Sequence, residues 1–117
     1  MKFFINRTTK EIIEVVLGND TTFTSEGSEM VELKANSTDA AGEKHVPVMT
    51  VEGNTVHVVV GSVLHPMTEE HSIQFIALET KQGVQRKALL PTDQPIADFV
   101  LAEGDEVVAA YEYCNLH

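Results

Sequence analysis

The sequence predicts an all-β protein, most of which folds as an immunoglobulin-like antiparallel β-sandwich. From residue 45 onward, short runs rich in β-branched and aromatic residues alternate with turn signals, at the spacing expected of a sandwich. No stretch shows the apolar period of a helix of ordinary length. The chain has 117 residues and is 43% hydrophobic, which suits one main domain with a modest core.

About six or seven short antiparallel strands are expected in this sandwich. Residues 46–51 and 55–60 flank a Glu-Gly-Asn turn and are predicted to form a hairpin. Residues 72–78 follow with apolar and polar side chains in alternation. The remaining strands are expected at residues 84–90, 97–101 and 106–113, separated by turns or proline-containing loops.

The amino-terminal part is predicted to be a separate small module, residues 1–35. Residues 21–24 and 30–33 have the composition of short strands, whereas residues 11–17 fit either a strand or a helical turn. Residues 34–44 are small, polar and without a period, as in a linker or loop. The sequence therefore predicts two domains, 1–35 and 36–117.

The charge balance excludes several classes of partner. There are 8 Lys and Arg against 18 Asp and Glu, a formal net charge of −10, and such an acidic surface repels nucleic acids. No basic amphipathic stretch indicates membrane binding, and no apolar run approaches the length of a membrane span. The apolar patch at residues 3–5 is too short for a signal peptide, so we expect a cytoplasmic protein.

The histidines and the single cysteine suggest a metal site. His65 and His71 lie on either side of a bend that contains a proline, and His117 follows Cys114 by three residues. A thiolate with several neutral imidazoles suits Fe, Cu, Zn or Ni and excludes Mg or Ca. His57 lies in the middle of a strand and is predicted to be structural or exposed. The stretches that hold the other candidates are predicted to converge on one metal: His45, His65, His71, Cys114 and His117.

Two other functions remain open at this point. A blue-copper electron carrier also has a Cys-x-x-His segment near the end of a β-sandwich, and Met67 would be its weak axial ligand. Such carriers use two histidines, whereas this chain offers four. The second alternative is a non-enzymatic β-sandwich with a structural zinc, whose site would be closed and four-coordinate.

Three segments together resemble the superoxide reductase family, which comprises desulfoferrodoxin and neelaredoxin. Residues 43–48, 60–71 and 113–117 are similar to the family's motifs, in the family's order and at compatible spacing, so that the resemblance covers about residues 36–117. It implies one mononuclear non-haem iron per chain. The implied ligands are four equatorial imidazoles and one axial thiolate, from His45, His65, His71, His117 and Cys114.

The resemblance also implies an activity, the one-electron reduction of superoxide to hydrogen peroxide. The sixth iron position would be open in the ferrous state, Glu43 would occupy it in the ferric state, and Lys44 would lie beside it. The positive charge of Lys44 would attract superoxide. The implied electron donor is rubredoxin or a similar small carrier, and a homodimer is expected, with a tetramer as the alternative.

The amino-terminal module departs from the two-iron members of this family. It resembles their small rubredoxin-like module, which carries paired cysteines before a similar Ile/Val-Glu-Val run. Here Cys114 is the only cysteine in the chain, so a four-cysteine iron site cannot form. We therefore expect a degenerate rubredoxin-like β module without metal.

Overall fold

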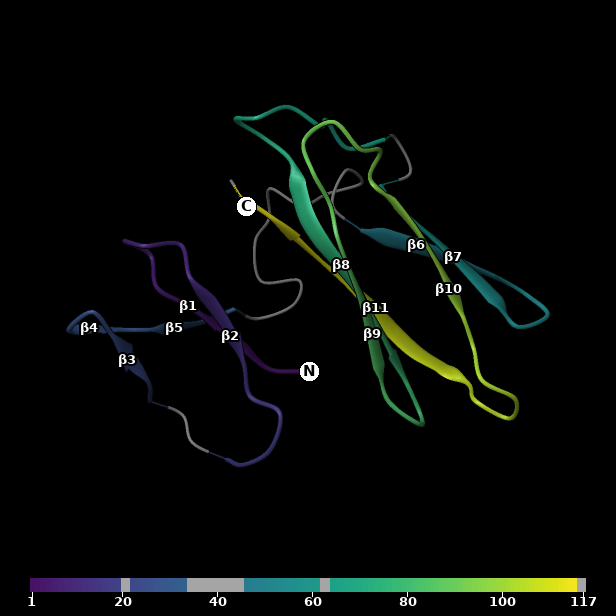
Figure 1. Ribbon diagram of the computed structural model, residues 1–117, viewed down its shortest axis with the longest axis horizontal. Coiled ribbons are helices and arrows are strands. Elements are labelled where there is room, and N and C mark those ends of the chain that lie inside the picture. Colours follow the sequence, from purple (N-terminus) through teal and green to yellow (C-terminus); the bar gives the residue numbers. More distant parts are fainter. Residues whose placement is uncertain (20–21, 34–45, 62–63, 116–117) are drawn as a thin grey trace. The chain divides into compact units, whose positions relative to one another are not determined.

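The computed structural model describes residues 1–19, 22–33, 46–61 and 64–115 (Figure 1). These residues form eleven β-strands and no helix, which confirms the prediction of an all-β fold. The chain divides into two compact units, Met1–Ser37 and Thr38–His117. The domain boundary at residues 35 and 36 stays a prediction. The described segments contain no helix long and apolar enough to cross a membrane.

The amino-terminal unit consists of small antiparallel sheets. Its three-stranded sheet has β1 (Phe3–Ile5) at the centre, between β2 (Ile12–Glu14) and β5 (Val31–Leu33). A two-stranded hairpin, β3 (Thr24–Ser25) and β4 (Ser28–Glu29), completes the unit. The stretch for which the sequence left strand or helical turn open thus contains β2. The apolar patch at the amino terminus is β1, whose three side chains are buried.

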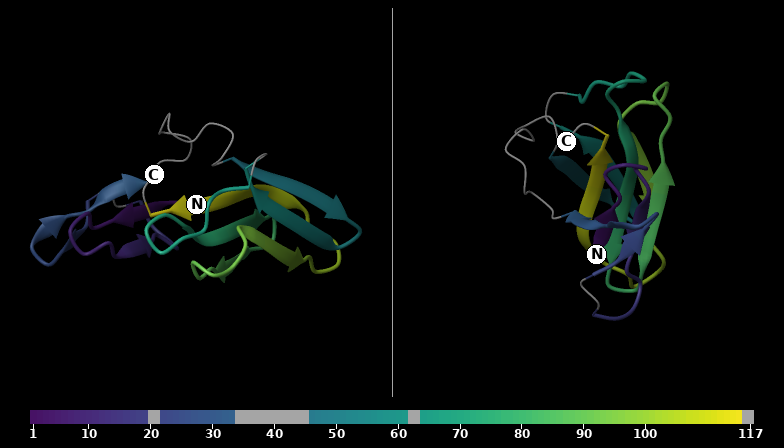
Figure 2. Two further views of the ribbon diagram at one scale, coloured as in Figure 1. Left: turned by 90° about the horizontal axis from the view of Figure 1, so that it is seen from above. Right: turned by 90° about the vertical axis from the view of Figure 1, so that its left-hand side faces the viewer.

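The second unit contains two three-stranded antiparallel sheets (Figure 2). The first has the order β10-β7-β6, from Ile96–Val100, Thr55–Val60 and Pro47–Glu52. The second has the order β11-β8-β9, from Val107–Cys114, Ile73–Thr80 and Val84–Ala88. Each of these strands lies within two residues of the position predicted from the sequence.

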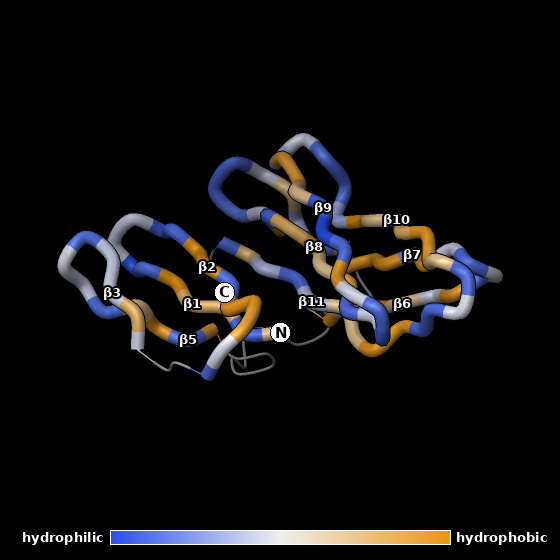
Figure 3. Tube along the Cα trace, turned by 60° about the horizontal axis from the view of Figure 1, so that its bottom comes forward, coloured by the Kyte–Doolittle hydropathy of each residue, from blue (hydrophilic) through white to orange (hydrophobic). Residues whose placement is uncertain are grey.

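Side-chain alternation explains why the two sheets form a sandwich. Val56, Val58 and Val60 of β7 are fully buried, and they join Ile76 and Leu78 of β8 in one hydrophobic cluster. Burying each such side chain contributes about 1.5–3 kcal/mol. The β7 strand is coloured hydrophobic along most of its length, whereas several turns are hydrophilic (Figure 3). Cys114 belongs to the same cluster, so the end of β11 is anchored in the core.

A polar clamp joins the β8–β9 turn to the β10–β11 loop. The hydroxyl of Thr80 donates to Asp105 Oδ2 at 2.6 Å, and the backbone N–H groups of Gln82 and Glu106 donate to Asp105 Oδ1 at 3.1 and 2.8 Å. The Thr80 hydrogen bond is the main reason why the pKa of Asp105 lies below its usual 3.8. The ionised carboxylate is therefore the form that stabilises this end of the sandwich.

The clamp predicts a pH-dependent effect of Asp105→Asn. A carboxyl group with a lowered pKa stabilises the fold above its unfolded pKa, and this contribution is lost as pH falls through the folded pKa. The melting temperature of the metal-free variant should be lower than that of the wild type at pH 7, and the difference should shrink below about pH 4. Glu103→Gln removes an exposed charge from the same loop and is the control. A difference that is constant from pH 7 to pH 3 would contradict the role of the carboxylate.

Candidate metal centre

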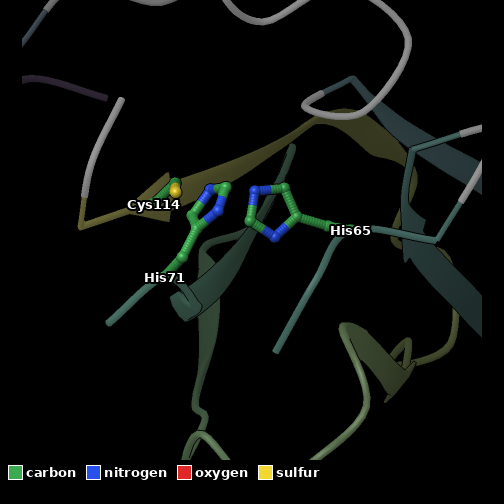
Figure 4. Close-up of side chains that lie close together, drawn as sticks. All are labelled: His65, His71 and Cys114. Atoms are coloured by element: carbon green, nitrogen blue, oxygen red, sulfur yellow. The ribbon is translucent and has the colours of Figure 1, made fainter. Parts of the chain in front are cut away.

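Three of the predicted ligands meet at one end of the sandwich. The ligand atoms of His65, His71 and Cys114 all lie within 4.8 Å of one another (Figure 4). Two donors on one ion lie at most about 4.4 Å apart, twice a metal–ligand bond, so this cluster is nearly at coordination distance. His65 and Cys114 are each 2% exposed and His71 is half-buried.

The backbone after β7 and one hydrogen bond fix His65. Gly61 has a φ of 89°, which favours glycine, and its N–H donates to Val46 O at 2.8 Å as the chain leaves the strand. The N–H of His65 then donates to Val60 O at 3.3 Å. The ring Nδ1 lies 2.7 Å from Pro66 O. A carbonyl oxygen only accepts, so Nδ1 carries the proton and Nε2 is left with the lone pair that a metal needs.

A tight turn places His71. The backbone groups of Thr68 and His71 bond in both directions, at 2.9 and 3.3 Å, and the N–H of His71 also donates to the Thr68 hydroxyl at 3.1 Å. Met67 Sδ accepts the N–H of Ile73 at 3.4 Å, and Met67 packs against the core. The imidazoles of His71 and His65 meet nearly edge to face, with ring centroids 4.6 Å apart.

Cys114 ends β11 opposite Ile73, the first residue of β8. The residue after it, Asn115, donates its backbone N–H to Ser72 O at 3.2 Å. Its side chain accepts the N–H of Ser72 at 2.9 Å and donates to Glu70 O at 3.1 Å. Sequence reasoning missed Asn115; its only signal was an amide side chain directly after a candidate ligand.

A half-buried glutamate, whose Oε2 atom is buried, lies on the same strand. Glu112 pairs with Ile76, and because it lies two residues from Cys114 in β11, its side chain points to the core face. No hydrogen-bond partner for its Oε2 occurs in the part of the chain that the structure describes. Burial raises the pKa of Glu112 from 4.5 to about 7. Burial thus favours the neutral form of this carboxyl group.

The other predicted site residues have different outcomes. His45, His117, Glu43 and Lys44 lie outside the described residues. His57 is exposed on β7, and its Nδ1 forms a hydrogen bond with the side chain of Asp98 on β10. The nitrogen and sulfur donors that do cluster fit iron, copper or zinc and do not fit magnesium or calcium.

The comparisons with known proteins identify the family. The family profile described as desulfoferrodoxin matches residues 37–117. A desulfoferrodoxin of Clostridium acetobutylicum is 38% identical over 117 residues, which cover 100% of this chain and 91% of the relative. A superoxide reductase of Pyrococcus abyssi is 33% identical over 105 residues, covering 75% of this chain and 91% of the relative.

Solved structures show the same relationship. The superoxide reductase of Treponema pallidum aligns with a TM-score of 0.84 at 35% identity, over 99% of this chain and 91% of that protein. The one-iron superoxide reductase of Giardia intestinalis aligns with a TM-score of 0.52 at 36% identity, over 64% of this chain and 90% of that protein. The fold and the site thus define a β-sandwich protein with a mixed imidazole and thiol centre. The chain belongs to the desulfoferrodoxin family, whose members include superoxide reductases.

Proposed function

We propose that this protein is a superoxide reductase that holds one mononuclear iron per chain. In the reaction, superoxide takes up one electron and two protons and becomes hydrogen peroxide. The observation that carries the proposal is the buried cluster of His65, His71 and Cys114 in a member of the desulfoferrodoxin family. The proposed ligands are the four imidazoles and one thiolate that the resemblance implies, from His45, His65, His71, His117 and Cys114.

Backbone contacts support the inclusion of the two ligands outside the described residues. His45 precedes Val46, whose carbonyl oxygen accepts the N–H of Gly61 at the start of the loop that carries His65. His117 follows Asn115, which is hydrogen-bonded to Ser72 beside His71. The neighbours of both residues thus lie at the end of the sandwich that carries the cluster.

Each proposed site residue would have its own role in the reduction of superoxide. A ferrous ion bound to these ligands would supply the electron. The Cys114 thiolate would donate charge to the metal, as axial thiolates do in haem enzymes. Lys44 would attract the superoxide anion and orient the water that provides a proton. Glu43 would supply a carboxylate that can bind the oxidised iron.

Metal analysis together with product stoichiometry tests this function. The purified protein should contain one iron per chain and should yield one hydrogen peroxide for each superoxide consumed when a reductant is present, without oxygen release. Oxygen release in equal amount to peroxide would indicate dismutation and would contradict the proposal. One copper and no iron would favour the electron carrier, and one zinc with no redox response would favour a structural site.

Lys44→Ala is expected to slow the capture of superoxide about 10-fold at low salt, because a cation near a site raises the encounter rate of an anion. The difference from the wild type should shrink as salt screens the charge. Pulse radiolysis at several ionic strengths measures both effects. Lys87→Ala removes the same charge from an exposed position on β9 and is the control. Equal rates for the Lys44 variant and this control at low salt would exclude steering by Lys44.

The partners follow from the same proposal. Rubredoxin or a similar small carrier would return the electron to the site, and the chain would act in the cytoplasm as a homodimer or a tetramer. Reduced rubredoxin should be oxidised by superoxide faster in the presence of catalytic amounts of this protein. Light scattering of the purified chain measures the oligomeric state.

A further inference from the structure

We propose that Asn115 is a positioning residue, whose carboxamide holds the segment of His71 at ligand distance from Cys114. This role rests on the proposed function, because it assumes that His71 and Cys114 bind the same metal. It concerns a residue that contributes no ligand atom itself. Asn115 forms three hydrogen bonds with the backbone on either side of His71, and its Oδ1 also lies beside the Cys114 thiol.

The pairing of β11 with β8 is irregular at the strand end that carries Cys114. The pairing of β8 and β11 is regular from Ala109 and Glu79 to Tyr113 and Phe75, and it then shifts, so that Cys114 pairs with Ile73. Such an irregularity weakens the ladder at the point where Cys114 must be held. The ladder resumes one residue later, where the Asn115 N–H donates to Ser72 O at 3.2 Å.

The Asn115 side chain forms hydrogen bonds on both sides of His71. Its Oδ1 accepts the N–H of Ser72 at 2.9 Å, and its Nδ2 donates to Glu70 O at 3.1 Å. The residues before and after His71 are thereby tied to the residue next to Cys114. The distance between the two ligand segments is set by one short side chain, not by the ladder alone.

The Asn115 carboxamide also lies beside the Cys114 thiol. Cys114 Sγ lies 4.0 Å from Asn115 Oδ1, the oxygen that Ser72 holds in place. The site therefore needs a short side chain that donates and accepts at once, which asparagine provides. Aspartate keeps the shape but loses the bond to Glu70 O, and alanine loses both side-chain bonds. Residues that orient metal ligands typically change metal affinity 10–100-fold when they are replaced.

The test compares Asn115→Asp and Asn115→Ala with the wild type. In both variants, the dissociation constant for Fe²⁺ should rise about 10–100-fold in anaerobic titration of the metal-free protein. The sulfur-to-iron charge-transfer band of the oxidised protein should shift. In the metal-free Ala variant, the amide of Ser72 should exchange with solvent at least about 10-fold faster, because it loses its acceptor. The near-isosteric Asp variant keeps the test valid if the Ala variant does not fold.

Thr80→Val is the matched control, because it removes side-chain hydrogen bonds from the opposite end of β8. It should lower the melting temperature without changing the Fe²⁺ dissociation constant or the band. If the Asn115 variants behave like this control, Asn115 is only structural and the inference is wrong. A wild-type protein that binds no Fe²⁺ would overturn the proposed function itself, which separates the two failures.

Discussion

Cys114→Ser is expected to remove the sulfur-to-iron charge-transfer band and to lower superoxide reduction at least about 100-fold, since it removes a ligand and not only its support. Serine retains the size of the side chain but supplies no thiolate at neutral pH. Absorption spectra of the iron-loaded, oxidised protein measure the first effect, and pulse radiolysis measures the second.

The control must reproduce the burial of a new hydroxyl group. Cys114 is 2% exposed and belongs to the hydrophobic cluster, so serine at this position also destabilises the core. Ala97→Ser introduces a hydroxyl group into the same cluster, from β10, at a residue that is 1% exposed. It should leave the band and the rate unchanged. A Cys114→Ser protein that keeps the band would refute thiolate ligation.

The sandwich strands could be predicted because their physics is local. In β7, buried Val56, Val58 and Val60 alternate with outward-facing residues, and the period of two is visible in the sequence. The strand at Phe3–Ile5 was missed because all three of its side chains are buried and so short a run shows no alternation. Its place between two other strands depends on long-range pairing, which the sequence does not encode locally.

The candidate site was predicted from residue types and missed where it depends on backbone groups. His65, His71 and Cys114 stand out because imidazole and thiol side chains are rare and bind metals. The carbonyl oxygen of Pro66, which selects the His65 tautomer, is a main-chain group that every residue has. Asn115 carries a clear role only once Glu70 and Ser72 are known to lie beside it.

The sequence also gives no sign of what stabilises the amino-terminal unit, because the residue concerned is an ordinary asparagine. Asn6 is 1% exposed, and its Oδ1 accepts the N–H groups of Thr8 and Thr9 at 2.9 and 3.1 Å. Its Nδ2 donates to Ser25 O at 3.0 Å, across nineteen residues. In a small module whose residues 1–35 contain no cysteine, such a buried and hydrogen-bonded amide stabilises the turn between β1 and β2 and ties it to β3.

Asn6→Ala is therefore expected to destabilise the amino-terminal unit by about 3 kcal/mol, because it leaves two N–H groups and one carbonyl group without their partner. Asn6→Asp keeps the acceptor oxygen and loses only the bond to Ser25, so its effect should be smaller. Hydrogen exchange of the β1 amides measures the stability of this unit directly. Asn19→Ala, at an exposed position in the same unit, should change the exchange rates little.

The same variant tests the predicted domain division. If residues 1–35 and 36–117 are separate domains, Asn6→Ala should speed exchange in β1 while Fe²⁺ affinity and the exchange of the β7 amides stay at wild-type values. If exchange in β7 accelerates by the same factor as in β1, the two units unfold together and the division is wrong. If exchange in β1 itself does not change, the Asn6 hydrogen bonds do not stabilise the module, and its stability must come from the burial of Phe4 and Ile5.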